Sequence, residues 1–254
     1  MRAATHPRPR TRRTAVAALL CATVALGAAA CGPFGEDTKP AAGPFGDLTG
    51  SQIVDKAFAA TKAAKSLTVR VDLKSPDEPT SGFLALDTRG NCAGTLTLGA
   101  TSTAELIKAD DKNVYMRFDE AYLREQVKEE SPEVQEATLK ELRGRWLEAP
   151  LSDPDAKDML QLCDLKSLLD GFEQGASGIV KGEETTVDGQ KALKLTEPGD
   201  KGESSTLYVA TEGTPYVLKM VTVGGDEPGT IAFSQYGKPV VAKVPAAKNI
   251  VRTD

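Results

Sequence analysis

The strongest constraint on the fold is a series of short runs in which apolar and polar residues alternate. The clearest is 67–73, where Leu67, Val69, Val71 and Leu73 alternate with Thr68, Arg70 and Asp72. Because successive side chains of a strand point to opposite faces, this run predicts a half-buried strand. Further strands are expected at 83–87, 92–98, 103–108, 113–118, 179–187, 191–197, 205–210, 216–223, 229–236 and 240–243. Short strands separated by tight turns indicate an antiparallel meander.

Helical patterns precede and interrupt these strands. Thr49 and Gln52 form a capping-box pattern, and apolar residues then recur at helical spacing, which predicts a helix at 50–65. The segment 119–172 is rich in Glu, Leu, Gln and Lys, which favour helix. We expect it to be a helical insert, with helices near 119–130 and 132–143, a short connection at Trp146 and Leu147, and a last helix that begins at Asp153-Pro154 and ends at Gly171. This order of strands, helical insert and further strands predicts a single α+β domain over 48–254.

The first 30 residues have the pattern of a signal peptide. Five Arg lie within residues 1–13, and a mostly apolar run follows from Ala15 to Ala30. A 16-residue helix is about 24 Å long, shorter than the hydrocarbon core of a bilayer, which is about 30 Å thick. The run is therefore typical of an export signal rather than a stable membrane span.

The apolar run ends in Ala28-Ala29-Ala30-Cys31, which resembles a bacterial lipobox. In such a motif the Cys is acylated and becomes the new N-terminus, so Cys31 is the expected lipid attachment. Cleavage after Ala30 without lipidation, or lipidation at Cys21, are the alternatives. Residues 31–47 contain the sequence Gly-Pro-Phe-Gly twice, and this density of Gly and Pro predicts a flexible tether. The domain would then lie on the extracytoplasmic face of the cell membrane, with the bilayer as its partner through Cys31.

Removal of the first 30 residues changes the charge and the chemistry of the chain. The 31 basic residues fall to 26 against 36 acidic ones, which gives a net charge of −10, and the only histidine, His6, is lost. Without His there is no Ser-His-Asp triad, no Cys-His dyad and no His-ligated zinc. An acidic chain without a basic cluster argues against nucleic acid as a partner. We find no motif for a catalytic nucleophile, a phosphate loop or a calcium loop, and expect a monomer that is not an enzyme and has no metal or other cofactor.

Two cysteines, Cys92 and Cys163, remain in the body of the domain. An even pair in an exported chain predicts a disulfide, which would join the helical insert to the first group of strands. Two buried free thiols are the alternative.

Several strands carry large apolar residues on both faces. Met116 and Val114 flank Tyr115, and Met220 lies among valines. A sheet that helices cover on one face should leave its other face polar. The excess of apolar residues on the second face predicts either a tighter core or a cavity between sheet and helices that holds an apolar ligand. The candidate cavity lining consists of Val69, Val71, Leu84, Leu86, Leu96, Leu98, Val114, Met116, Leu162 and Met220.

The chain resembles actinobacterial envelope lipoproteins of the LppX/LprG type, which are related in fold to the LolA/LolB lipoprotein carriers. The resemblance spans about residues 48–250, in runs at 90–96, 104–108, 113–117, 207–209, 213–216 and 233–240, with Pro245. It implies a LolA-like half-barrel, a curved antiparallel sheet of about 10–11 strands with helices on its concave face. It also implies an apolar cavity that binds lipids or lipoglycans in some members. The pairing of Cys92 with Cys163 resembles a Streptomyces-like subgroup.

These features together predict a membrane-anchored lipoprotein that binds or carries a lipid or lipoprotein between its sheet and helices. The alternative is an envelope interaction or sensor module with a filled core and no ligand.

Overall fold

The computed structural model describes residues 43–74, 79–98, 101–153, 163–170, 178–199, 202–225 and 228–252. Residues 41–254 form one compact unit. The signal segment, Cys31, most of the tether, Leu162 and the first part of the expected last helix lie outside the described residues.

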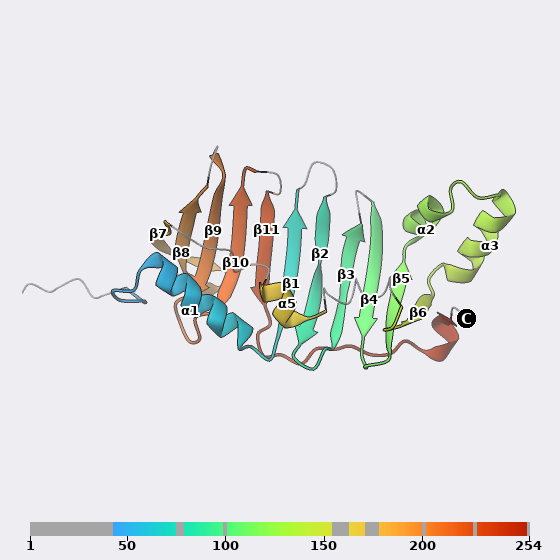
Figure 1. Cartoon of the computed structure of the whole chain (residues 1–254), viewed down its shortest axis with the longest axis horizontal. Coiled ribbons are helices and arrows are strands. Elements are labelled where there is room, and N and C mark those ends of the chain that lie inside the picture. The colour runs from blue at the N-terminus through green and yellow to red at the C-terminus, as the bar shows by residue number, and fades with distance from the viewer. Residues whose placement is uncertain are drawn as a thin grey trace, which may run out of the picture. The chain divides into compact units, whose positions relative to one another are not determined.

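One sheet of twelve strands dominates the described residues, in the order β12-β6-β5-β4-β3-β2-β1-β11-β10-β9-β8-β7 (Figure 1). The strands of its first half are β1 (Ser66–Leu73), β2 (Thr80–Asp87), β3 (Cys92–Leu98), β4 (Ser102–Lys108), β5 (Asn113–Phe118) and β6 (Trp146–Pro150). Those of its second half are β7 (Val180–Val187), β8 (Gln190–Pro198), β9 (Ser204–Ala210), β10 (Val217–Val223) and β11 (Gly229–Ser234), and β12 (Ile250–Arg252) closes the chain.

Neighbouring strands are antiparallel except β6 and β12, which pair in parallel. The two halves of the meander meet where β1 pairs with β11, with Val69 opposite Phe233. This large open antiparallel sheet, with helices beside it, confirms the expected α+β fold. The strand count is twelve rather than ten or eleven, because two strands were not foreseen.

Helix α1 begins where its capping-box pattern predicts, and the caps of the other helices are seen in the structure. In α1 (Gly50–Lys62) the Thr49 side chain accepts from the Gln52 backbone and the Gln52 side chain accepts from the Thr49 backbone. Helix α2 (Glu120–Gln126) is capped by Asp119, and α3 (Pro132–Leu142) by Ser131, with Pro132 at its first position. Of the expected last helix, α5 (Leu165–Asp170) is described.

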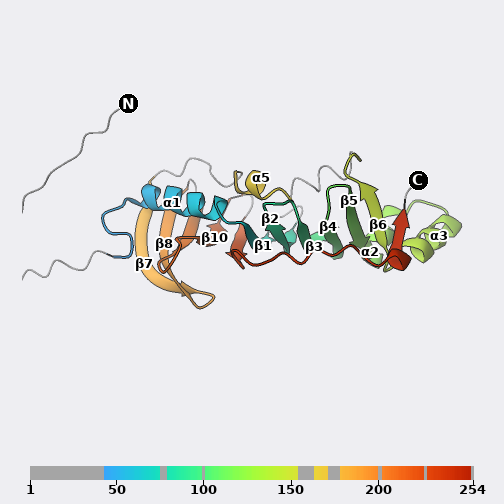
Figure 2. The same cartoon turned by 90° about the horizontal axis from the view of Figure 1, so that it is seen from below.

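The sheet has two different faces. Helices α1 and α5 lie on one of them, which we call the helix-covered face; its strand residues include Val69, Leu84 and Leu106 (Figure 2). The opposite, helix-free face carries Thr68, Arg70 and Phe83. Residues 238–246, which we call the C-terminal strap, run from β11 to β12 on the side away from α1 and α5 (Figure 2).

Two expectations about secondary structure were wrong. Trp146 and Leu147 were expected in a connection within the helical insert, but they begin β6, which pairs with β5. The strand is stabilised by burial of Trp146 against Tyr115 and Ile250, contacts that are distant in sequence. Residues 240–243 are not a strand but part of the strap, since Pro239 and Pro245 lack the N–H groups that a ladder needs.

Candidate functional site

The helix-covered face carries a continuous apolar row across the middle of the sheet. The strand registers place Phe233, Val69, Leu84, Gly94, Leu106 and Met116 side by side on six neighbouring strands. Apart from Gly94, these residues are at most 7% exposed and belong to one core cluster. This row is the floor on which the helices pack.

Two helices cover this floor. Ile53, Ala57 and Phe58 of α1 and Leu165 and Leu169 of α5 are buried in the same cluster. The ion pair of Lys62 Nζ with Asp170 Oδ1, at 2.6 Å, connects the two helices. The helices therefore share one apolar surface with the sheet.

The C-terminal end of α1 is bound to the start of β10 by buried polar groups. Thr61 Oγ1 accepts a hydrogen bond of 3.0 Å from the Val217 amide, and the Tyr236 hydroxyl donates to the Val217 carbonyl. Burial raises the pKa of Tyr236 well above its ordinary value. Tyr236 also stacks on Tyr216, with ring centroids 3.9 Å apart. These contacts fix α1 on the second half of the sheet.

A second apolar row lies beside the first and is only half-buried. Met220, Ile231, Val71, Gly82 and Leu96 occupy neighbouring positions on five strands, two residues along from the buried row. The side chains of the four residues other than Gly82 pack against the core cluster, yet each keeps part of its surface exposed. An apolar row that its own helices leave partly uncovered is the feature of this face that can accept a ligand.

Each row contains one glycine that shapes the floor, Gly94 in the buried row and Gly82 in the half-buried row. A Cβ at Gly94 would lie 2.0 Å from the Phe83 carbonyl oxygen and 2.8 Å from a Leu84 methyl group. A Cβ at Gly82, whose φ is +151°, would lie 2.3 Å from the Thr95 carbonyl oxygen. Both positions require glycine, because the adjacent strand approaches too closely for any side chain.

Eight of the ten candidate cavity residues come together in one cluster on the helix-covered face. Val69, Leu84, Leu86, Val114 and Met116 are buried, whereas Val71, Leu96 and Met220 are half-buried. Leu98 belongs to β3, but its side chain and the whole of Leu162 lie outside the described residues. Ile231 was missed, although its alternation with Phe233 in β11 signals the same face. That these residues line a cavity remains a prediction.

A disulfide joins Cys92 to Cys163, as the cysteine count predicts, with 5.4 Å between the two Cα atoms. Cys92 begins β3 and Cys163 lies two residues before α5, so the bond holds α5 near the β2–β3 turn. Both residues are buried.

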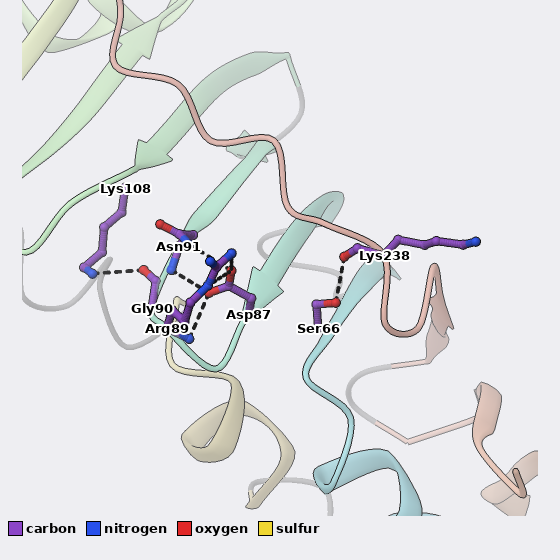
Figure 3. A network of polar contacts seen from close by, with 7 residues as sticks. All are labelled: Ser66, Asp87, Arg89, Gly90, Asn91, Lys108 and Lys238. Atoms are coloured by element: carbon purple, nitrogen blue, oxygen red, sulfur yellow. Dashed lines mark hydrogen bonds and ion pairs between the residues drawn. The ribbon is translucent and has the colours of Figure 1, made fainter.

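The β2–β3 turn beside this disulfide is ordered by the carboxylate of Asp87 (Figure 3). Its oxygens accept from the backbone and side chains of Arg89 and Asn91, at 2.8–3.2 Å. Burial alone would raise the pKa of Asp87, but the hydrogen bonds from Asn91 and Arg89 outweigh it, and the pKa is lowered. Lys108 Nζ completes the turn by donating to the Gly90 carbonyl at 2.9 Å.

Two kinds of site are not found in the described part of the chain. No group of three or more His, Cys, Asp or Glu side chains is placed there to hold a metal ion. No helix in the same part is long and apolar enough to cross a membrane.

Comparison with known proteins gives matches among solved structures alone. LprF from Mycobacterium bovis is 15% identical, covers 78% of this chain and 97% of its own, and has a TM-score of 0.49. LppX from Mycobacterium tuberculosis is 15% identical, with coverages of 75% and 96% and a TM-score of 0.46. The MucA/MucB complex from Pseudomonas aeruginosa is 12% identical, with coverages of 78% and 59% and a TM-score of 0.31. No protein-family model and no curated protein matches.

The open antiparallel sheet with helices on one face is the architecture that the sequence resemblance implies. The Streptomyces-like subgroup remains a prediction.

Proposed function

We propose that this protein is a monomeric, lipid-anchored carrier on the extracytoplasmic face of the cell membrane, and that it binds a lipid or a lipoprotein acyl chain on the helix-covered face. The observation that supports this most is the half-buried row formed by Met220, Ile231, Val71 and Leu96. It adjoins a buried floor on the face of the sheet that carries α1 and α5, and a partly covered apolar surface of this kind is the usual setting of an apolar ligand site.

Binding would work by removal of acyl surface from water. Each methylene buried on the row contributes about 0.8 kcal/mol. The site needs no polar catalytic group for this, and none of the motifs that carry hydrolytic or transfer chemistry is present in the sequence. Hence the proposal is a carrier rather than an enzyme.

The disulfide suggests how access is controlled. Cys92–Cys163 holds the start of α5 at the β2–β3 turn, and the Lys62–Asp170 ion pair holds its other end to α1. Opening of the ion pair would let α5 move about Cys163, which would make the half-buried row on the same face more accessible while the start of the helix stays attached.

The test compares glutamine substitutions at two adjacent positions of β11 whose side chains lie on opposite faces of the sheet. Ile231→Gln places an amide in the half-buried row, whereas Thr230→Gln changes the helix-free face next to it. We expect Ile231→Gln to weaken the binding of a fluorescent fatty acid to residues 41–254 by at least about fivefold, since burial of an unpaired amide costs about 1–3 kcal/mol. Thr230→Gln should bind like the wild type.

Circular dichroism melting checks that both variants stay folded. Equal affinities in the two folded variants would contradict the proposed site. Absence of uptake by the wild type would favour the alternative, a ligand-free interaction module with a filled core.

The anchor has its own test. Cys31→Ala should release the full-length protein from membranes into the medium, because a diacylated cysteine supplies the stable attachment. Retention of the Cys31→Ala protein in the membrane fraction would overturn the anchor.

A further inference from the structure

The helix-free face carries a row of cations at regular spacing. The registers place Lys194 on β8, Lys219 on β10 and Arg70 on β1 in one line across the sheet, with Tyr208 and Ala232 between them. Each cation is two strands from the next, which corresponds to about 10 Å. None of the three forms an ion pair within the described residues.

The C-terminal strap extends this basic surface. It is held at one end by hydrogen bonds of Ser66 with Gly237 and Lys238, and at the other by the pairing of β12 with β6. Lys238 and Lys243 are exposed on the strap, and Lys238 reaches away from Ser66 (Figure 3). Neither lysine forms an ion pair among the residues that the structure describes.

Apolar side chains are exposed among these cations. Phe83 ends the cationic row, 38% exposed, with the Arg70 guanidinium 5.5 Å from its ring centroid. Val241 and Val244 on the strap are 72% and 48% exposed. Basic residues mixed with aromatic and aliphatic ones are characteristic of surfaces that bind the interface of an anionic bilayer, where both kinds of contact contribute.

Acidic residues are few on this surface, although the exported chain as a whole carries a net charge of −10. Asp72 is two residues from Arg70 on the same face. Glu105 is paired with Arg117 at 2.6 Å, and Glu148 with Arg252 at 2.8 Å. Glu183 and Glu184 lie on the edge strand β7, where the register shifts. The unpaired Lys194, Lys219 and Arg70 thus outnumber the unpaired acids in their own strands, so an anionic surface can approach the helix-free face.

We infer that the helix-free face docks on an anionic phospholipid bilayer, with Lys194, Lys219 and Arg70 toward the headgroups and the helix-covered face turned away. The inference rests on the proposed anchor, because the 13 residues from Cys31 to Gly43 can span at most about 45 Å and would keep the domain near the membrane. A diacylated Cys31 would supply stable attachment by itself, so the basic surface would determine which face of the domain meets the bilayer.

The experiment uses residues 41–254, the compact unit, so that no lipid anchor contributes. Co-sedimentation is measured with vesicles of phosphatidylglycerol and phosphatidylcholine in equal parts, and with vesicles of phosphatidylcholine alone. We expect binding to the anionic vesicles only, weakened by salt. Lys194→Gln/Lys219→Gln should weaken it about 25-fold, since each cation near an anionic surface contributes about fivefold.

The matched control is Lys56→Gln/Lys140→Gln, which changes the net charge equally at exposed positions of α1 and α3. It should bind as tightly as the wild type. No preference for anionic vesicles, or equal loss in the two double variants, would overturn the inference. Binding to soluble heparin but not to vesicles would also overturn it, in favour of a polyanion. Fatty-acid uptake, measured on the same variants, should be unchanged, which separates this surface from the proposed cargo site.

Discussion

The disulfide gives the most quantitative prediction for the stability of this domain. Cys92 and Cys163 are 71 residues apart in sequence, and they are the two cysteines of residues 41–254. Cross-linking a loop of this length lowers the entropy of the unfolded chain and stabilises the native state by about 4 kcal/mol on the chain-entropy model. Since domains of this kind are stable by about 5–15 kcal/mol, reduction of the bond should remove a large part of the total.

The assay is urea unfolding of residues 41–254, oxidised and fully reduced, followed by the fluorescence of Trp146. This is the single tryptophan of the chain and is buried. We expect the free energy of unfolding in water to fall by about 4 kcal/mol on reduction. Cys92→Ala/Cys163→Ala should show a similar loss in the absence of any reductant.

Ligand exchange is the second readout of the same perturbation. Reduction should speed the release of a bound fluorescent fatty acid, because α5 is no longer held to β3. A stability change below about 1 kcal/mol, in both the reduced protein and the alanine variant, would refute the reasoning that the bond closes this loop.

Two further predictions concern the β2–β3 region. Asp87→Asn should destabilise the domain by about 1.5–3 kcal/mol at neutral pH, because it removes a buried charged acceptor from Arg89 and Asn91. The folded-state pKa of Asp87 is depressed, so the carboxylate's contribution to stability is present above the ordinary pKa of 3.8 and is lost as pH falls through the folded-state pKa. The difference in urea midpoint between wild type and variant should therefore narrow below pH 3.8. A difference that stays constant with pH would contradict this. Gly94→Ala should destabilise by at least about 1–3 kcal/mol, because the new Cβ would meet the Phe83 carbonyl oxygen at 2.0 Å. The control is Gly182→Ala, where the atom nearest to the new Cβ would be 3.2 Å away. Thermal unfolding compares the two variants, and equal melting temperatures would contradict the close approach of Phe83 to Gly94.

Local patterns in the sequence were sufficient for most elements of this fold. The capping residue Thr49 predicts the start of α1, because a cap is satisfied by the nearest turn of its own helix. The alternation in 67–73 likewise predicts β1 and the face of each residue. Such signals depend on neighbours in sequence and are therefore readable without the fold.

Elements that depend on distant partners were not predictable in this way. The five-residue β6 follows a helix-forming stretch, and its identity as a strand comes from pairing with β5 and β12. The strap has a strand-like composition, but Pro239 and Pro245 prevent it from joining a ladder.

The same limit applies to the candidate site. Alternation assigns Val69 and Val71 to one face, but it cannot say that the first is buried and the second half-exposed. That difference is set by where α1 and α5 lie on the sheet, which the strand sequences do not encode. The cationic row is a consequence of register too, because Lys194, Lys219 and Arg70 come from strands that are far apart in the chain.

Native mass spectrometry of residues 41–254, secreted from cells and purified without detergent, tests the proposed carrier function most directly. The account predicts a bound lipid that adds a discrete mass to the folded protein, that is lost on denaturation, and that Ile231→Gln retains poorly. A protein that carries the mass of its own chain alone, and that takes up no fatty acid when lipid is supplied, would contradict it.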